Sequence, residues 1–113
     1  LSRKAKKAIE TKGPSFLNVL SPCNLGWKHP PNMTIAISKF ATETNVWPLY
    51  EYENGKITLN YKPKIPKKVD LYLRMQGRFK HLFKPENKNI LEKIQKYTDD
   101  QWKLLINRSK EQK

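Results

Sequence analysis

Residues 13–27 hold a short apolar run between two prolines, followed by the only cysteine: Gly13-Pro14-Ser15-Phe16-Leu17-Asn18-Val19-Leu20-Ser21-Pro22-Cys23-Asn24-Leu25-Gly26-Trp27. An apolar run bounded by breakers is typical of a strand covered on both faces, so we predict a buried strand at residues 16–20. Pro22 ends this strand and Gly26 frees the backbone, which places Cys23 in a tight loop at the strand's carboxyl end. Ligands bind at that edge of open α/β sheets. Cys23 is therefore a candidate cofactor ligand, and residue chemistry alone leaves an inert, packed cysteine open as the alternative.

The residues before this run predict an amphipathic helix. Apolar residues recur at helical spacing from Leu1 to Ile9, lysines occupy the other faces, and Gly13 ends the helix. A helix, a Gly-Pro breaker and a buried strand make one half of an α/β unit, so the predicted fold class is α/β.

The residues after Cys23 predict a loop and then a helix. Gly26 and the prolines exclude regular structure from Asn24 to Pro31; there we expect Trp27 to pack over the cysteine loop and His29 to be exposed. Asn32 is a plausible N-cap for a helix from Met33 to about Thr44. Its buried stripe is Met33, Ile37, Phe40 and Ala41.

Residues 47–61 predict a β-hairpin, because Asn54-Gly55 is the strongest short-range turn signal. A two-residue turn pairs Glu53 with Lys56, and the register then follows along both strands. Four apolar side chains share one face, which we expect to dock on the body of the subunit or on a neighbour: Tyr50, Tyr52, Ile57 and Leu59.

The tail predicts a proline-stiffened spacer, Lys62 to Lys68, and three helices. The first runs from Val69 to about Phe83 and is interrupted or bent at Gly77, and the second begins at Pro85. The last is opened by a capping box at residues 98–101, Thr98-Asp99-Asp100-Gln101.

Composition limits the classes of protein. The chain has 113 residues, 37% of them hydrophobic, a mean hydropathy of −0.81 and a single cysteine. These values exclude a disulfide framework and any membrane span, and they fit a single domain in a reducing cytoplasm. The net charge of +13 permits nucleic-acid binding, but the lysines are scattered and no recognition motif is present. We favour a solvated basic surface, with a possible role in attracting an acidic electron carrier.

Four motifs in order carry a family resemblance: Ser21-Pro22-Cys23-Asn24-Leu25-Gly26-Trp27, then Glu43-Thr44 with Trp47-Pro48-Leu49-Tyr50-Glu51, then Tyr61-Lys62-Pro63-Lys64, then Gln76-Gly77-Arg78-Phe79-Lys80-His81-Leu82. The series resembles the C-terminal part of the β subunit of pyruvate:ferredoxin oxidoreductase (pyruvate synthase) and related 2-oxoacid oxidoreductases. The likeness runs from about Ala5 to Trp102.

The resemblance implies cofactors, partners and one site residue. The complete subunit would hold thiamine diphosphate with magnesium and a 4Fe-4S cluster, with Cys23 as one cluster ligand. Its partners would be the rest of the β subunit, other oxidoreductase subunits, ferredoxin, pyruvate and coenzyme A. A cluster needs four thiolates and this chain has one, and the family's Gly-Asp-Gly element is absent. We therefore expect a piece of a larger subunit that is inactive alone.

The predicted organisation has two parts that meet near residues 30–32. Residues 1–31 would be the last part of the thiamine-diphosphate-binding α/β domain and would include the loop that carries the cluster ligand. Residues 32–113 would form a C-terminal extension of helix, hairpin and helical tail. The function this implies is oxidative decarboxylation of a 2-oxoacid in an anaerobic, multisubunit, cytoplasmic enzyme. Pyruvate is favoured, and a branched-chain 2-oxoacid stays open. The alternative is a small basic nucleic-acid-binding module. For the Gln76–Leu82 motif, subunit docking is favoured over anion binding by Arg78, Lys80 and His81.

Overall fold

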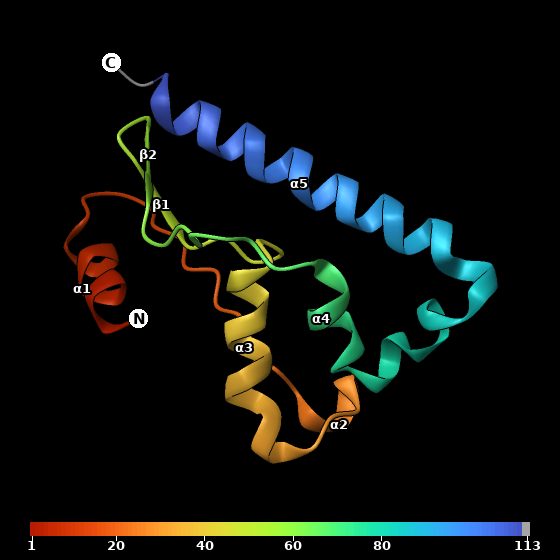
Figure 1. The fold of residues 1–113 in the computed structure, drawn as a ribbon. Coiled ribbons are helices and arrows are strands. Elements are labelled where there is room, and N and C mark those ends of the chain that lie inside the picture. The colour runs from red at the N-terminus through yellow and green to blue at the C-terminus, as the bar shows by residue number, and fades with distance from the viewer. Residues whose placement is uncertain (112–113) are drawn as a thin grey trace.

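The computed structural model describes residues 1–111, and it consists of helices with one small antiparallel sheet (Figure 1). The elements, with 3₁₀ helices marked η, are α1 (Ser2–Glu10), α2 (Asn24–Trp27), η1 (Pro31–Met33), α3 (Thr34–Glu43), β1 (Tyr50–Glu53), β2 (Lys56–Leu59), α4 (Val69–Arg74), η2 (Gly77–Phe83), η3 (Pro85–Asn87) and α5 (Lys88–Lys110). This mixture of helix and strand agrees with a fragment of an α/β protein. Residues 112–113, the end of the predicted C-terminal extension, lie outside the described part.

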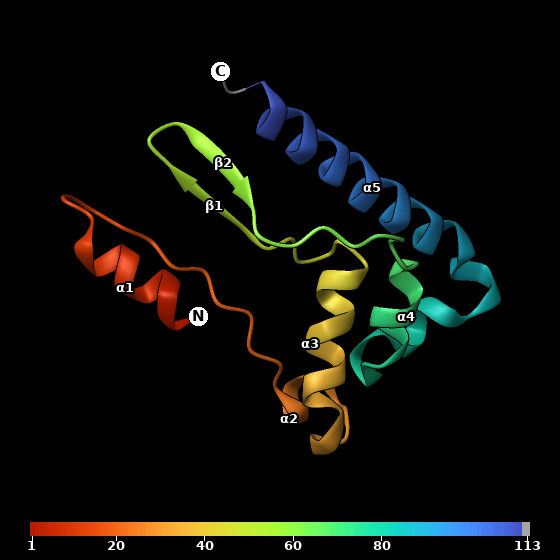
Figure 2. The ribbon, with the colours of Figure 1, turned by 60° about the vertical axis from the view of Figure 1, so that its left-hand side comes forward.

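The core lies where α3, α4 and η2 meet, with α4 between α3 and α5 (Figure 2). Ile37 and Ala41 are four positions apart on one face of α3, and both are fully buried. The remaining core residues are Val69, Tyr72, Leu73 and Leu82. Met33 and Phe40 pack against this cluster, so the predicted stripe of the helix at residues 33–44 is confirmed.

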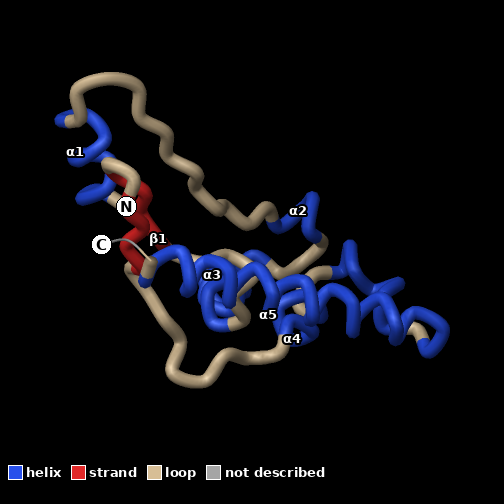
Figure 3. The backbone as a smooth tube through the Cα atoms, turned by 90° about the horizontal axis from the view of Figure 1, so that it is seen from above, coloured by secondary structure: helices blue, strands red, loops and turns tan. Residues whose placement is uncertain are grey.

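The prediction of a buried strand at residues 16–20 is wrong for this structure. Residues 11–23 form no helix or strand and run as a long loop from α1 to α2 (Figure 3). Phe16 is 86% exposed and Val19 is 54% exposed. A strand needs a neighbour to take up its backbone hydrogen bonds, and the two strands of the described residues pair only with each other.

The predicted hairpin is confirmed, including each predicted residue pair across the two strands. Tyr50 pairs with Leu59, and the register continues to Glu53 opposite Lys56. Asn54 and Gly55 have φ values of 49° and 79°, the left-handed conformation that a two-residue hairpin turn requires. Local turn chemistry therefore sets this register without help from tertiary packing.

Charge pairs join the hairpin to α1. The Lys7 ammonium lies 3.0 Å from a Glu51 carboxylate oxygen and 2.6 Å from one of Glu53. Hydrogen bonds to Glu53 and Glu51 raise the pKa of Lys7, and the bond from Lys7 lowers the pKa of Glu51. The Lys4 ammonium also donates to the Tyr50 carbonyl at 3.0 Å. In this chain α1 is held against the hairpin, apart from the core.

The apolar face of the hairpin is covered in part. β2 contacts α5, and Ile57 and Leu59 are half-buried. Tyr50 and Tyr52 on the same face stay exposed. The prediction that this face docks on the body of the subunit or on a neighbour is met within this chain by β2, which contacts α5.

The tail follows the predicted break at Gly77 but not the predicted capping box. α4 ends at Arg74, and η2 begins at Gly77. One continuous helix, α5, then covers residues 88–110, with Thr98 buried in its interior. The predicted helix start at Thr98 is therefore wrong.

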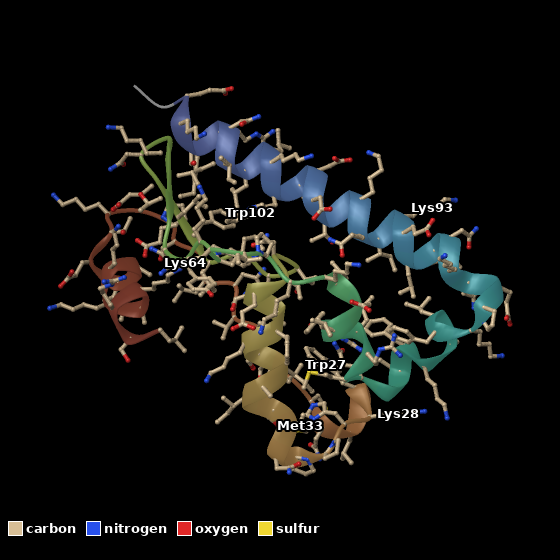
Figure 4. The ribbon with its side chains drawn as sticks, in the orientation of Figure 1. Trp27, Lys28, Met33, Lys64, Lys93 and Trp102 are labelled. Carbon is tan, nitrogen blue, oxygen red and sulfur yellow. The ribbon has the colours of Figure 1, made fainter. Side chains whose placement is uncertain are left out.

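Packing explains why α5 continues through residues 98–101. The Gln95 side chain accepts from the Val69 backbone N–H at 2.8 Å and donates to Asp99 at 2.9 Å, which fixes this turn against α4. One turn further on, the Trp102 side chain is buried and points from α5 toward the rest of the molecule, whereas Lys93 extends outward (Figure 4). Burial of this face outweighs the local preference of a Thr-Asp-Asp-Gln sequence for a helix start.

A further predicted cap is displaced. Asn32 lies inside η1, and the residue that precedes α3 is Met33, which has no side-chain capping bond. Pro31 starts this segment instead, as proline does readily at a first helical position. None of the helices within residues 1–111 is long and apolar enough to cross a membrane.

Candidate functional site

Cys23 lies directly before α2, a single helical turn of four residues. Its backbone is extended, with φ −110° and ψ 110°, and its sulfur accepts a hydrogen bond from the Gly26 backbone N–H at 3.3 Å. The thiol thus takes the capping role that an oxygen side chain usually has at this position. The predicted loop at residues 24–27 is a helical turn, and the exposed Cys23 caps it.

Gly26 keeps one side of the sulfur open. A Cβ atom at Gly26 would lie 3.5 Å from the Cys23 sulfur, which is ordinary van der Waals contact. With glycine there, no Cβ atom lies against that side of the sulfur. Among the described residues, the Cys23 thiol is thus exposed and not packed in the core.

The end of α2 is bent sharply at Lys28. Lys28 has φ 55° and ψ 62°, and its backbone N–H donates to the Leu25 carbonyl at 3.2 Å. The Trp27 N–H donates to the Cys23 carbonyl at 2.8 Å, and the His29 N–H to the Asn24 carbonyl at 3.1 Å. Every backbone bond in this turn therefore depends on the conformation of residues 27–29.

Gly77 of the fourth motif contacts this turn. Its backbone N–H donates to the Lys28 carbonyl at 2.9 Å. A Cβ atom at Gly77 would lie 2.9 Å from both the Lys28 Cβ and the Lys28 carbonyl oxygen, closer than real Cβ atoms approach. The first and fourth motifs, which are far apart in sequence, are thus brought together through a glycine that permits this approach.

Arg78 adds a second contact between these motifs. Its guanidinium carbon lies 4.2 Å from the centre of the Trp27 ring and 4.6 Å from that of Phe79. Its Nε donates to the Gln76 side-chain oxygen at 3.0 Å. Trp27 therefore packs between the core and Arg78. Arg78, Lys80 and His81 are all exposed, and of these three Arg78 lies over the Trp27 ring.

Gln76 is a residue whose importance sequence reasoning missed. Its side chain is 1% exposed; the amide nitrogen donates to the Tyr72 carbonyl at 3.0 Å, and the oxygen accepts from Arg78. The signal available in the sequence was a polar residue directly before the glycine that breaks the predicted helix. Gln76 joins the end of α4 to Arg78.

The prediction that His29 is exposed is wrong. The ring is 6% exposed, packs edge-on to Trp27, and its Nδ1 lies 2.9 Å from the Pro30 carbonyl oxygen. Two prolines turn the chain so that the ring faces inward, an effect that the polar neighbours of His29 do not reveal. Within residues 1–111 its Nε2 atom is buried without a hydrogen-bond partner.

The second and third motifs meet at the end of α3 that lies away from α2 (Figure 1). The Lys67 ammonium pairs with the Glu43 carboxylate at 2.7 Å, and Thr44 is buried with its hydroxyl on the Phe40 carbonyl at 2.7 Å. A hollow of about 440 Å³ is lined here by Glu43, Tyr61, Lys62, Pro63, Lys64, Ile65 and Lys67. The four motifs thus form two groups, one at each end of α3.

The residues that the structure describes do not assemble a metal centre among themselves. Among residues 1–111, no three side chains of His, Cys, Asp or Glu lie close enough together to hold a metal ion. Cys23 is accordingly a single potential ligand, held by a turn that the Gln76–Phe79 segment supports.

The known proteins that are similar to this chain are subunits with related names. No family model matches the chain. The pyruvate synthase subunit PorB of Methanocaldococcus jannaschii is 48% identical over 103 residues, which cover 91% of this chain and 33% of that protein. The PorB subunit of Thermotoga maritima is 43% identical over 104 residues, covering 91% and 32%. The ketoisovalerate oxidoreductase subunit VorB of Pyrococcus abyssi is 41% identical over 105 residues, also covering 91% and 32%.

These similarities extend over most of this chain but not over most of its relatives. The chain spans about one third of the length of the relatives it matches. The resemblance to 2-oxoacid oxidoreductase subunits that the four motifs predict is confirmed, whereas a nucleic-acid-binding module finds no support among these relatives. The chain is therefore a homologue, over about one third of their length, of the PorB and VorB subunits of pyruvate synthase and ketoisovalerate oxidoreductase.

Proposed function

We propose that this chain is part of the β subunit of a 2-oxoacid:ferredoxin oxidoreductase, with pyruvate as the first candidate substrate. The complete enzyme would decarboxylate the 2-oxoacid oxidatively, transfer the acyl group to coenzyme A and pass electrons through an iron–sulfur cluster to ferredoxin. Identities of 41–48% to PorB and VorB subunits over 91% of the chain carry this proposal. The VorB relatives keep a branched-chain 2-oxoacid as the competing substrate.

Cys23 would be one ligand of a 4Fe-4S cluster. Its sulfur is exposed and accepts a backbone N–H bond, which supports this role because N–H···S bonds tune the reduction potential of a cluster. A cluster of this type takes four thiolates, so the other three must come from outside this chain. This chain on its own does not fit a complete cluster.

Thiamine diphosphate and its magnesium would be held by other parts of the complete subunit. In that subunit we expect residues 16–20 to form the strand that their apolar pattern predicts, once neighbouring strands supply hydrogen-bond partners. The exposure of Phe16 and Val19 supports this, because both would be covered in such a sheet. Recovery of a soluble complex only when the remaining part of the subunit is coexpressed would agree with this expectation.

The basic surface supports an acidic electron carrier as a partner. The formal net charge is +13, with lysines spread along the chain. Complementary charge mainly accelerates encounter, so reduction of ferredoxin should slow as ionic strength rises.

Iron and acid-labile sulfide content tests the proposed function. Both are measured anaerobically in the complex that copurifies with this chain, as wild type and as Cys23→Ser. We expect the wild type to carry clusters and the serine variant to lose about one cluster, since each needs a full set of thiolates. Equal iron in the two proteins, or a chain that purifies alone and free of iron, would overturn the role proposed for Cys23.

A further inference from the structure

We propose that the Gln76–Phe79 segment is a positioning element that fixes the Cys23 turn, and that Gly77 and Arg78 act on Cys23 through Lys28 and Trp27. The consequence for a cluster rests on the proposed function, whereas the positioning itself rests only on the contacts within this chain. Neither Gly77 nor Arg78 touches the sulfur, so both are positioning residues.

The first step is the backbone contact at Gly77. The Lys28 carbonyl accepts from the Gly77 N–H at 2.9 Å, and Lys28 itself has the left-handed φ of 55° that a lysine rarely adopts. A strained residue of this kind keeps its conformation only when its surroundings fix it. The Gly77 bond supplies that restraint at the residue that ends α2.

The second step is the ring contact at Arg78. The guanidinium lies over the Trp27 ring at 4.2 Å and is itself held by the buried Gln76 oxygen at 3.0 Å. Trp27 is hydrogen-bonded through its N–H to the Cys23 carbonyl at 2.8 Å. Movement of the Trp27 ring is therefore transmitted through one backbone bond to the residue that carries the thiol.

The third step is that the support itself is rigid. Gln76 is buried and hydrogen-bonded to the last turn of α4, whose Tyr72 and Leu73 belong to the core. Gly77 and Arg78 thus extend from the best-packed part of the molecule toward its exposed cysteine. A ligand carried by a four-residue turn needs such support, because a short turn has little stability of its own.

Hydrogen exchange of residues 24–29 in the assembled complex tests the positioning directly. We expect Gly77→Ala and Arg78→Ala to speed exchange at the Trp27 and His29 amides. Arg74→Ala is the matched control, because Arg74 stacks on Phe83 at the same distance of 4.2 Å and its ion pair, with Asp70, lies within α4. Unchanged exchange in both test variants, or an equal increase in the control, would overturn the proposal.

A second substitution separates the specific contact from general damage. Lys28→Gly removes the Cβ that would clash with an alanine at residue 77 and also accepts a φ of 55° without strain. The Lys28 carbonyl stays in place, so we expect the double variant Lys28→Gly/Gly77→Ala to recover part of the protection lost in Gly77→Ala. The clash with the Lys28 carbonyl oxygen persists in the double variant, so recovery is expected to be incomplete. A double variant less protected than Gly77→Ala alone would contradict a contact between residues 28 and 77 as the cause.

The cluster gives an independent measurement. If Cys23 is a ligand, Gly77→Ala and Arg78→Ala should weaken iron retention by about 10- to 100-fold, the range for residues that orient metal ligands, and shift the midpoint potential of the remaining cluster. Faster exchange together with iron that is unaffected by Cys23→Ser would uphold the positioning and refute the cluster. Loss of iron in Cys23→Ser together with unchanged exchange in Gly77→Ala would uphold the cluster ligand and refute the positioning.

Discussion

Gly26, within the cysteine turn, and Gly77, which contacts it, differ in the space available for a side chain. A Cβ at Gly77 would collide with Lys28, whereas a Cβ at Gly26 would only touch the Cys23 sulfur. The same substitution should therefore have opposite effects at the two positions.

Gly26→Ala should preserve the fold and shield the thiol. Alanine is favoured over glycine inside a helical turn by about 0.5–1 kcal/mol, so the free energy of unfolding should stay level or rise slightly. The added methyl group covers one side of the sulfur, so alkylation of Cys23 by iodoacetamide should slow. An alkylation rate equal to or above that of wild type would show that Gly26 does not control access.

Ile37→Ala should be among the most damaging core substitutions. Ile37 is fully buried, and truncating a buried isoleucine to alanine lowers the free energy of unfolding by about 2–5 kcal/mol. Ile65→Ala is the control, because that side chain is 85% exposed and its loss should change stability by less than about 0.5 kcal/mol. Urea denaturation of the two variants compares them, and similar midpoints would contradict the position of the core.

Individual residues show where sequence reasoning succeeds and where it does not. The stripe of Ile37 and Ala41 follows from helical periodicity alone. His29 and Gln76 are polar residues that the structure buries, because a Pro-Pro turn and a helix end direct them inward. Burial of this kind depends on what the neighbouring chain supplies, and periodicity carries no information about it.

At the scale of elements, the hairpin depends on its turn. Gly55 has φ 79°, so Gly55→Ala should destabilise the turn by about 1–2 kcal/mol. Gly55→Asn should cost less, because asparagine tolerates this conformation. Amide exchange of residues 50–59 measures both variants, and equal protection in the two would argue against the left-handed turn.

A proline substitution tests whether α5 is one continuous helix. Proline is accepted at the first position of a helix but costs about 3 kcal/mol in a helix interior. Asp99→Pro should therefore destabilise the chain strongly and lower its helical circular dichroism. Asp99→Ala controls for the lost hydrogen bond from Gln95. A mild effect of Asp99→Pro would instead favour two helices that meet at Thr98.

The elements that the sequence predicts correctly are those set by neighbours along the chain. The Asn54-Gly55 turn fixes a register, and Gly77 breaks a helix. The strand at residues 16–20 fails because its hydrogen-bond partners are not in this chain, and the capping box fails because contacts of Gln95 and Trp102 favour one long helix. The exposed Cys23 was found from its motif, but the support from Gly77 and Arg78 required the fold.

At the scale of the whole molecule, charge fixes the position of α1. Lys7 pairs with Glu51 and Glu53, and the two pKa shifts have opposite signs. Glu51 contributes to docking above its ordinary pKa of 4.5, and this contribution disappears as pH falls through its lowered pKa. Lys7 contributes below 10.5, and its contribution disappears as pH rises through its raised pKa. Docking of α1 should be strongest between these limits.

Both low pH and high salt should release α1 from the hairpin. The protection factors of the amides in residues 2–10, which correct for the pH dependence of intrinsic exchange, should fall below pH 4.5. They should also fall in about 1 M NaCl, where the screening length is about 3 Å. Lys7→Ala should give the same result at neutral pH. Lys6→Ala is the control, because Lys6 forms its ion pair within α1, with Glu10. Protection of residues 2–10 that does not change with salt concentration would mean that another contact holds α1.

The bond between Gly77 and Lys28 also bears on the order of events during folding. It closes a loop of roughly 50 residues, and closing so long a loop has an entropic cost that short-range elements avoid. The hairpin and the helices can form from local contacts in microseconds. The cysteine turn, in contrast, reaches its final shape only after α3, α4 and η2 have come together.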